Sequence, residues 1–275
     1  MKARRNDRAP APRRLRELPK EPFPPIPIAD KPAETKRENL YRAIRNTRAF
    51  MDKRHSPEPF MEELRQYYPA PQYFLESNRK ANEKLGLSRI EAFYYSIIPS
   101  LTRTCLSQRQ GMTPKLSTPE SMAEYLKTLY IGVHVECFYL IMLNGHGRLI
   151  HRALLQKGGA DHAPFYLGQV ISEALREEAK YVVLAHNHPG GTRRPSKEDL
   201  HCTLRALNAF ATMQIPMLDH MIVARDTVVS IRGSGLLPSM LWKASLEGQR
   251  IPAGWSNEPN ACYNNSSEIH KSDDK

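Results

Sequence analysis

The chain has 275 residues, with 40 Lys and Arg against 29 Asp and Glu, a formal net charge of +11 and a pI near 9.5. This length can hold one or two domains with a proper core. No apolar run approaches the ~20 residues of a membrane span, and no apolar segment follows the basic N-terminus as it would in a secretory signal. The four cysteines form no C-x2-C pair, which argues against a disulfide framework or a cysteine-ligated zinc and fits a reducing cytoplasm.

Residues 1–32 are rich in arginine and proline, a composition that cannot form a packed core, and we predict a disordered basic arm. The positive charge favours polyanions such as nucleic acid, which the arm could bind by counterion release. A solvated, solubilising tail is the other interpretation, and the absence of aromatic side chains among the arginines slightly favours it.

Residues 33–110 are predicted to form a small helical region. Apolar residues recur at helical spacing over Glu38–Phe50 and Pro59–Tyr68, and Ser88 is placed to cap an apolar helix over Ile90–Leu101. The pattern by itself indicates no function beyond packing.

Residues 111–240 alternate between helix and strand patterns, and the chain beyond them, 241–275, is predicted to be a polar C-terminal tail. Asn144-Gly145 between two apolar runs is a strong hairpin signal. The order of elements predicts an α/β fold with a mixed sheet flanked by helices. In chain order, the expected elements are a helix opened by Thr118-Pro119, strands Glu136–Leu143 and Leu149–Leu155, a helix from Leu167 to about Ala179, strand Tyr181–Ala185, a helix capped by Ser196, and strands Met217–Ala224 and Thr227–Arg232.

A cluster of metal-ligand residue types follows the third strand. His186 and His188 are two apart on an extended chain, so their side chains point to the same side. Ser196 has the character of a helix N-cap, and Asp199, three residues on, shares its helix face. Two imidazoles and one carboxylate are the ligand set of a catalytic zinc site with a fourth position for water. The alternative interpretation, which needs no metal, is that Ser196 and Asp199 form only a capping box.

The spacing H-x-H-x7-S-x2-D resembles the signature of JAMM metalloproteases, and Glu136 matches the glutamate that this signature carries on an earlier strand. The surrounding sequence is similar to the bacterial RadC-like JAB proteins over roughly Leu116–Leu237. Matching pieces include Ser117-Thr118-Pro119-Glu120, Glu136-Cys137-Phe138, Leu184-Ala185-His186-Asn187-His188-Pro189 and Leu218-Asp219-His220-Met221-Ile222-Val223.

The resemblance implies a JAB/MPN fold of cytidine-deaminase-like architecture. It also implies a Zn²⁺-dependent hydrolase that cleaves a peptide or isopeptide bond in a protein substrate not yet identified. His186, His188 and Asp199 would then bind zinc, Glu136 would be the general base and Ser196 would stabilise the oxyanion. His220 is expected to be a structural or supporting residue and not a ligand.

The same resemblance leaves an alternative open, because RadC-like proteins have long been labelled DNA-repair proteins. In that case the JAB domain would belong to a nucleic-acid-associated protein and would not be chiefly a protease. The Gly-rich helix-hairpin-helix that usually binds phosphate backbones in this family is missing here, since only Gly111 lies between Leu101 and Leu116. Zinc nucleobase deaminases are set aside because the chain lacks the P-C-x-x-C part of their signature.

Overall fold

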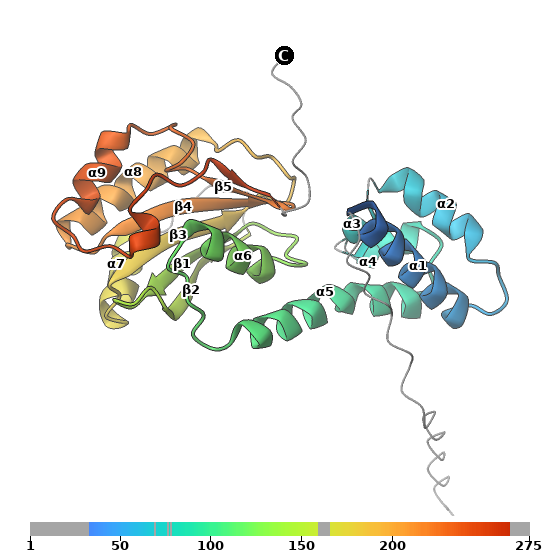
Figure 1. Cartoon of the computed structure of the whole chain (residues 1–275). Coiled ribbons are helices and arrows are strands. Elements are labelled where there is room, and N and C mark those ends of the chain that lie inside the picture. Colours follow the sequence, from blue (N-terminus) through green and yellow to red (C-terminus); the bar gives the residue numbers. More distant parts are fainter. Residues whose placement is uncertain (1–32, 69, 76, 78, 159–165, 265–275) are drawn as a thin grey trace, which may run out of the picture. The chain divides into compact units, whose positions relative to one another are not determined.

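The computed structural model describes residues 33–68, 70–75, 77, 79–158 and 166–264 (Figure 1). The predicted arm over 1–32 and the last part of the predicted tail, 265–275, lie outside the described residues. Within the described ranges, no helix combines the length and the apolar character needed to cross a membrane.

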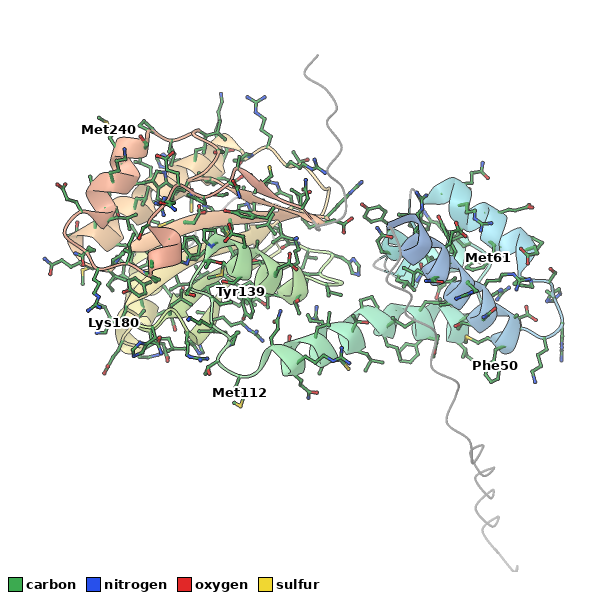
Figure 2. All side chains as sticks on the ribbon, viewed as in Figure 1. Phe50, Met61, Met112, Tyr139, Lys180 and Met240 are labelled. Carbon is green, nitrogen blue, oxygen red and sulfur yellow. The ribbon has the colours of Figure 1, made fainter. Side chains whose placement is uncertain are left out.

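The N-terminal helices share a core of their own. Tyr41, Phe60, Phe74 and Tyr95 are buried there, and so is Met61, which Figure 2 labels. Ser88 caps the last of these helices through a reciprocal capping box with Glu91, as the sequence predicts. The helices are α1 (Ala33–Met51), α2 (Glu58–Tyr67), α3 (Pro71–Leu75), α4 (Arg79–Lys84) and α5 (Arg89–Gln110).

A six-stranded mixed sheet follows, which confirms the predicted fold class. Its spatial order is β2-β1-β3-β4-β5-β6. Strands β3 and β4 are parallel, and all the remaining neighbouring pairs are antiparallel. The strands are β1 (Cys137–Leu143), β2 (Leu149–Lys157), β3 (Tyr181–Asn187), β4 (Met217–Ala224), β5 (Thr227–Ser230) and β6 (Cys262–Tyr263).

Helices cover both faces of this sheet, so the central strands are buried on both sides (Figure 1). One face packs against α6 (Pro119–Leu129), and the other against α7 (Leu167–Arg176), α8 (Lys197–Thr212) and α9 (Ser239–Leu246). Side chains alternate between the two faces along each strand. On β3, Val182 and Leu184 lie on the α8 face, while Val183 and Ala185 lie on the α6 face.

The prediction of a polar tail beyond residue 240 is wrong for residues 241–264. Trp242 on α9 is buried in the core on the α8 face, whereas Trp255 and Tyr263 are buried on the α6 face. The Trp255 indole nitrogen also donates a hydrogen bond to the carbonyl of Leu116 (3.1 Å). Three buried aromatic side chains and the pairing of β6 with β5 thus join this segment to the sheet.

We predict that Trp255→Ala lowers the free energy of unfolding by about 3–5 kcal/mol, because it removes a fully buried indole and leaves a cavity. Met240→Ala is the matched control, since Met240 on α9 is 70% exposed (Figure 2) and its loss should change stability by less than about 0.5 kcal/mol. Chemical denaturation measures both values. Equal, small effects of the two substitutions would show that the C-terminal segment is not part of the core.

Candidate metal centre

Strand β3 carries both histidines to one face of the sheet at its carboxyl end. His186 continues the series Val182, Leu184 on the α8 face, and His188 lies one step beyond the end of the strand. The backbone N–H of His188 still donates to the carbonyl of Val223 on β4 (2.9 Å), so the extended conformation persists through this residue. The two imidazoles therefore project toward the start of α8.

The chain then turns back through a glycine pair. Gly191 has a φ of +79°, which favours glycine, and a Cβ atom there would also require the side chain of Arg225 to move. The Gly191 N–H donates to the carbonyl of His188 (2.9 Å), which closes the turn. The turn returns the chain to the sheet, where α8 begins.

A capping box at the start of α8 fixes the third side chain. Ser196 Oγ accepts from the N–H of Asp199 (3.0 Å), and Asp199 Oδ2 accepts from both the N–H and the hydroxyl of Ser196 (2.7 Å each). These bonds engage Oδ2, whereas Oδ1 faces His186. The cap therefore starts the helix and aims the carboxylate at the same time.

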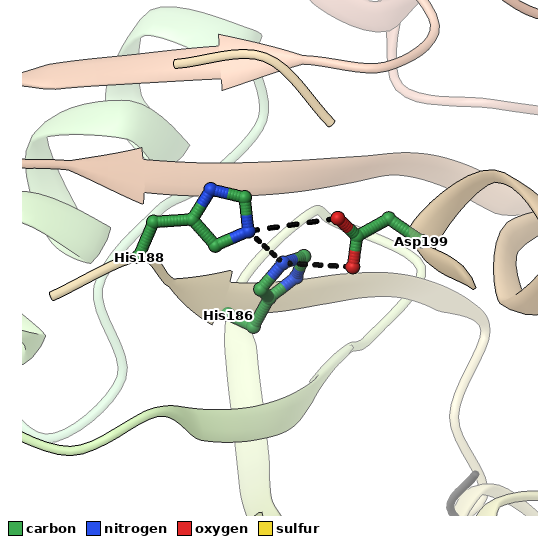
Figure 3. Close-up of side chains that lie close together, drawn as sticks. All are labelled: His186, His188 and Asp199. Atoms are coloured by element: carbon green, nitrogen blue, oxygen red, sulfur yellow. Dashed lines mark hydrogen bonds and ion pairs between the residues drawn. The ribbon is translucent and has the colours of Figure 1, made fainter. Parts of the chain in front are cut away.

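The three side chains converge on one point (Figure 3). His186 Nε2 lies 3.0 Å from His188 Nε2 and 3.1 Å from Asp199 Oδ1, and His188 Nε2 lies 3.5 Å from Asp199 Oδ2. Ligand atoms about 2.0–2.1 Å from a tetrahedral zinc are about 3.3–3.4 Å apart. The two distances from His186 Nε2 are a few tenths of an ångström shorter than this, so the donor set fits zinc in type and comes close to it in spacing.

The charges of the cluster suit a divalent cation. Burial raises the pKa of Asp199, but its contacts with His186 and His188 outweigh the effect of burial and hold that pKa well below its usual range. Burial lowers the pKa of His188, but Asp199 and the carbonyl of Thr192 raise it by more than burial lowers it, so the net shift is upward. Burial holds the pKa of His220, behind His186, well below its usual value. The cluster thus offers an anionic carboxylate beside imidazoles, and a metal would compete with protons for the imidazole nitrogens.

Glu136 precedes β1 on the same side of the sheet as the histidines. In the antiparallel pairing of β1 with β3, Phe138 is opposite His186, so the register continued by two residues places Glu136 opposite His188. The Phe138 ring stacks on the His186 imidazole at 5.1 Å with an interplanar angle of 7°, and Glu136 shares its face because it is two residues away. Glu136 is exposed, and its charge adds to the smaller causes that raise the pKa of His188.

Asn187, between the two histidines, points to the opposite face and clamps the segment that carries Glu136. Its side-chain oxygen accepts from the N–H of Cys137 (2.8 Å), and its amide nitrogen donates to the carbonyls of Val135 (3.1 Å) and Val133 (3.4 Å). Asn187 is only 4% exposed. Sequence analysis missed this role, because nothing in the local pattern reports a bond across 50 residues.

A cavity of about 190 Å³ borders the cluster at His188. Its lining is mostly neutral, with Arg225 as its charged side chain, and includes Tyr130, His134, Asn187 and Pro189. Burial lowers the pKa of His134, which favours its neutral form. Of the predicted site residues, His188 lines this cavity, whereas His186, Asp199, Glu136 and Ser196 do not.

A second group of potential ligands consists of His151 on β2 with Glu173 on α7 and Glu177 directly after α7. Arg176 already forms ion pairs with Glu173 (2.5 Å) and Glu177 (3.0 Å), and His151 is exposed. A guanidinium between two carboxylates competes with a cation for the same oxygen atoms. This group therefore makes a useful control and carries no functional assignment.

We predict that Asn187→Leu lowers the free energy of unfolding by about 1–3 kcal/mol, because it leaves the buried N–H of Cys137 without its partner. Asn208→Leu is the control, since Asn208 is exposed on α8 and its replacement should stay within about 0.5 kcal/mol of wild type. Urea denaturation of both variants measures the difference. If Asn187→Leu left the free energy of unfolding unchanged, the Asn187 amide would not hold the segment that carries Glu136.

Comparison with known proteins agrees with the fold and the motif. Residues 116–236 match the family described as RadC-like JAB domain. A UPF0758 protein of Bordetella petrii is 37% identical over 152 residues, which are 55% of this chain and 68% of that protein. UPF0758 proteins of Neisseria meningitidis serogroup C and Vibrio parahaemolyticus are 31% and 29% identical, over 56% and 60% of this chain and 68% and 73% of theirs. The chain belongs to the RadC-like JAB domain family.

Proposed function

We propose that this protein is a zinc-dependent hydrolase of the JAMM type that cleaves a peptide or isopeptide bond. The observation that carries the proposal is the convergence of His186, His188 and Asp199, whose ligand atoms all lie within 4.8 Å of one another. If these residues served only to cap a helix and end a strand, two imidazoles and a carboxylate would not need to lie in contact. Membership of the RadC-like JAB domain family agrees with this function, although the names of the relatives state no activity.

In this proposal His186 and His188 bind the metal through Nε2, and Asp199 binds it through Oδ1. A zinc ion held by these residues would supply Lewis-acid activation of the scissile carbonyl and of a water molecule, whose pKa it would lower to about 7. The three ligands leave one position for water or substrate, as catalytic zinc sites do.

Glu136 is the proposed general base. Its predicted place opposite His188 puts its carboxylate on the α8 face, beside the ligand cluster. There it would take a proton from the attacking water and pass it to the leaving nitrogen. Its exposure is compatible with this role, because the carboxylate must reach both the water and the substrate.

Ser196 is the proposed oxyanion donor, and its hydroxyl proton is already bonded to Asp199 Oδ2. Asp199 Oδ2 would keep the backbone N–H of Ser196 at 2.7 Å if the hydroxyl turned away. We therefore propose that the hydroxyl turns toward the oxyanion when substrate binds, at the cost of one of two bonds to the carboxylate.

The cavity beside His188 is the proposed place of the substrate residue next to the scissile bond. Its neutral walls and single arginine suit a polypeptide with at most one acidic group there. The nucleic-acid alternative depends on residues 1–32, which lie outside the described part of the chain, and it stays a prediction.

We predict that Glu136→Gln retains wild-type zinc content but cleaves peptides about 10²–10⁴-fold more slowly, because it keeps the ligands and removes the base. His186→Ala should lose the metal. Glu177→Gln, in the group around Arg176, is the control and should change neither property. Metal content is measured by inductively coupled plasma mass spectrometry, and cleavage by mass spectrometry of a proteome-derived peptide library before and after incubation.

Two results would contradict the proposal. Wild-type protein without near-stoichiometric zinc, or His186→Ala with full zinc content, would refute the metal centre. Equal cleavage by zinc-loaded wild type and Glu136→Gln would refute the role of Glu136 as base.

A further inference from the structure

A chain of three buried polar groups lies behind the predicted ligands. Nδ1 of His186 is 2.9 Å from Nε2 of His220, and Nδ1 of His220 is 2.6 Å from Oγ1 of Thr203. The Thr203 hydroxyl is in turn 2.6 Å from the backbone carbonyl of Asp199. His186, His220 and Thr203 are each 0% exposed, so no solvent can replace a missing partner. The chain thus begins at one predicted ligand and ends at the backbone of another.

These distances allow protons to be assigned from the end of the chain. A carbonyl can only accept, so the Thr203 hydroxyl donates to Asp199, as threonine in a helix commonly does four residues back. Thr203 Oγ1 then accepts from His220, which places the His220 proton on Nδ1. His220 Nε2 is therefore an acceptor, and it receives the proton of His186 Nδ1.

The last step leaves Nε2 of His186 without a proton, with its lone pair toward His188 and Asp199. A metal needs this form, because a protonated nitrogen has no lone pair to donate. The reverse chain would have Thr203 donate to His220 and His220 donate to His186, with the His186 proton on Nε2, where it would block the metal. Only the first direction gives the hydroxyl proton to the Asp199 carbonyl, and only the first direction leaves His186 Nε2 free to bind a metal.

We propose that Thr203 and His220 are positioning residues that hold His186 in the tautomer that binds metal. This inference rests on the proposed metal centre and adds to it a mechanism for preparing one ligand. It also links two ligands through α8, since Thr203 is one helical turn after Asp199. Neither residue contacts the substrate in this proposal.

Thr203 offers a matched pair of variants. Thr203→Val keeps the shape of the side chain and removes the hydroxyl, whereas Thr203→Ser keeps the hydroxyl. We predict that Thr203→Val weakens zinc binding about 10- to 100-fold, as loss of a ligand's supporting partner usually does, and that Thr203→Ser stays close to wild type. Competition with a chromophoric chelator gives the dissociation constants, and thermal unfolding of the metal-free proteins shows whether both variants fold.

A second measurement needs no variant. In zinc-loaded wild type with ¹⁵N-labelled histidine, His220 should show a pyrrole-type shift at Nδ1 and a pyridine-type shift at Nε2. A role in packing alone would not fix this pattern. A His220 proton on Nε2, or wild-type zinc affinity in a folded Thr203→Val, would overturn the inference. Failure of the wild type to bind zinc would instead remove the metal centre on which the inference rests.

Discussion

The capping box between Ser196 and Asp199 is the interaction on which the geometry of the centre depends. It starts α8, gives hydrogen-bond acceptors to the N–H groups of Ser196 and Asp199 at the N-terminus of that helix, and fixes the Asp199 carboxylate. Strand β3 positions the two histidines, whereas the cap positions Asp199. Without the cap, the carboxylate would not be held at a fixed position relative to the histidines. A common helix-starting motif thereby sets the third corner of a metal site.

The strand beneath this cap serves two purposes on its two faces. His186 and His188 point toward α8, where they meet Asp199, and Asn187 points the other way and bonds to the segment before β1. A shift of one residue along β3 would exchange the faces and destroy both arrangements. The pairing of Phe138 with His186 therefore sets the predicted position of the base and of the ligands together.

Local signals in the sequence were enough to predict much of this arrangement. Alternation along β3, the glycine turn and the Ser196 cap are each encoded within a few residues, so the predicted cluster could be read from one short segment. The position of Glu136 depends on the register between β1 and β3, strands about 50 residues apart, and only the family resemblance suggested it. The contacts of Thr203 and His220 were equally invisible, because they join a helix and a strand through tertiary packing.

For the C-terminal segment, the local sequence led to a wrong prediction. Trp242, Trp255 and Tyr263 are separated by polar residues without helical or strand periodicity, so composition favoured a tail. Trp255 and Tyr263 are buried on the α6 face of the sheet and Trp242 on the α8 face, and a local pattern cannot report such surfaces. Isolated aromatic residues after a predicted domain therefore deserve a place among candidate core residues.

X-ray absorption spectroscopy at the zinc edge tests the central claim most directly, since it reports the ligands of the metal without a substrate. The account predicts a four-coordinate site with only nitrogen and oxygen donors at about 2.0–2.1 Å and the multiple scattering of two imidazoles. Sulfur scattering at about 2.3 Å, or the absence of imidazole scattering, would contradict it.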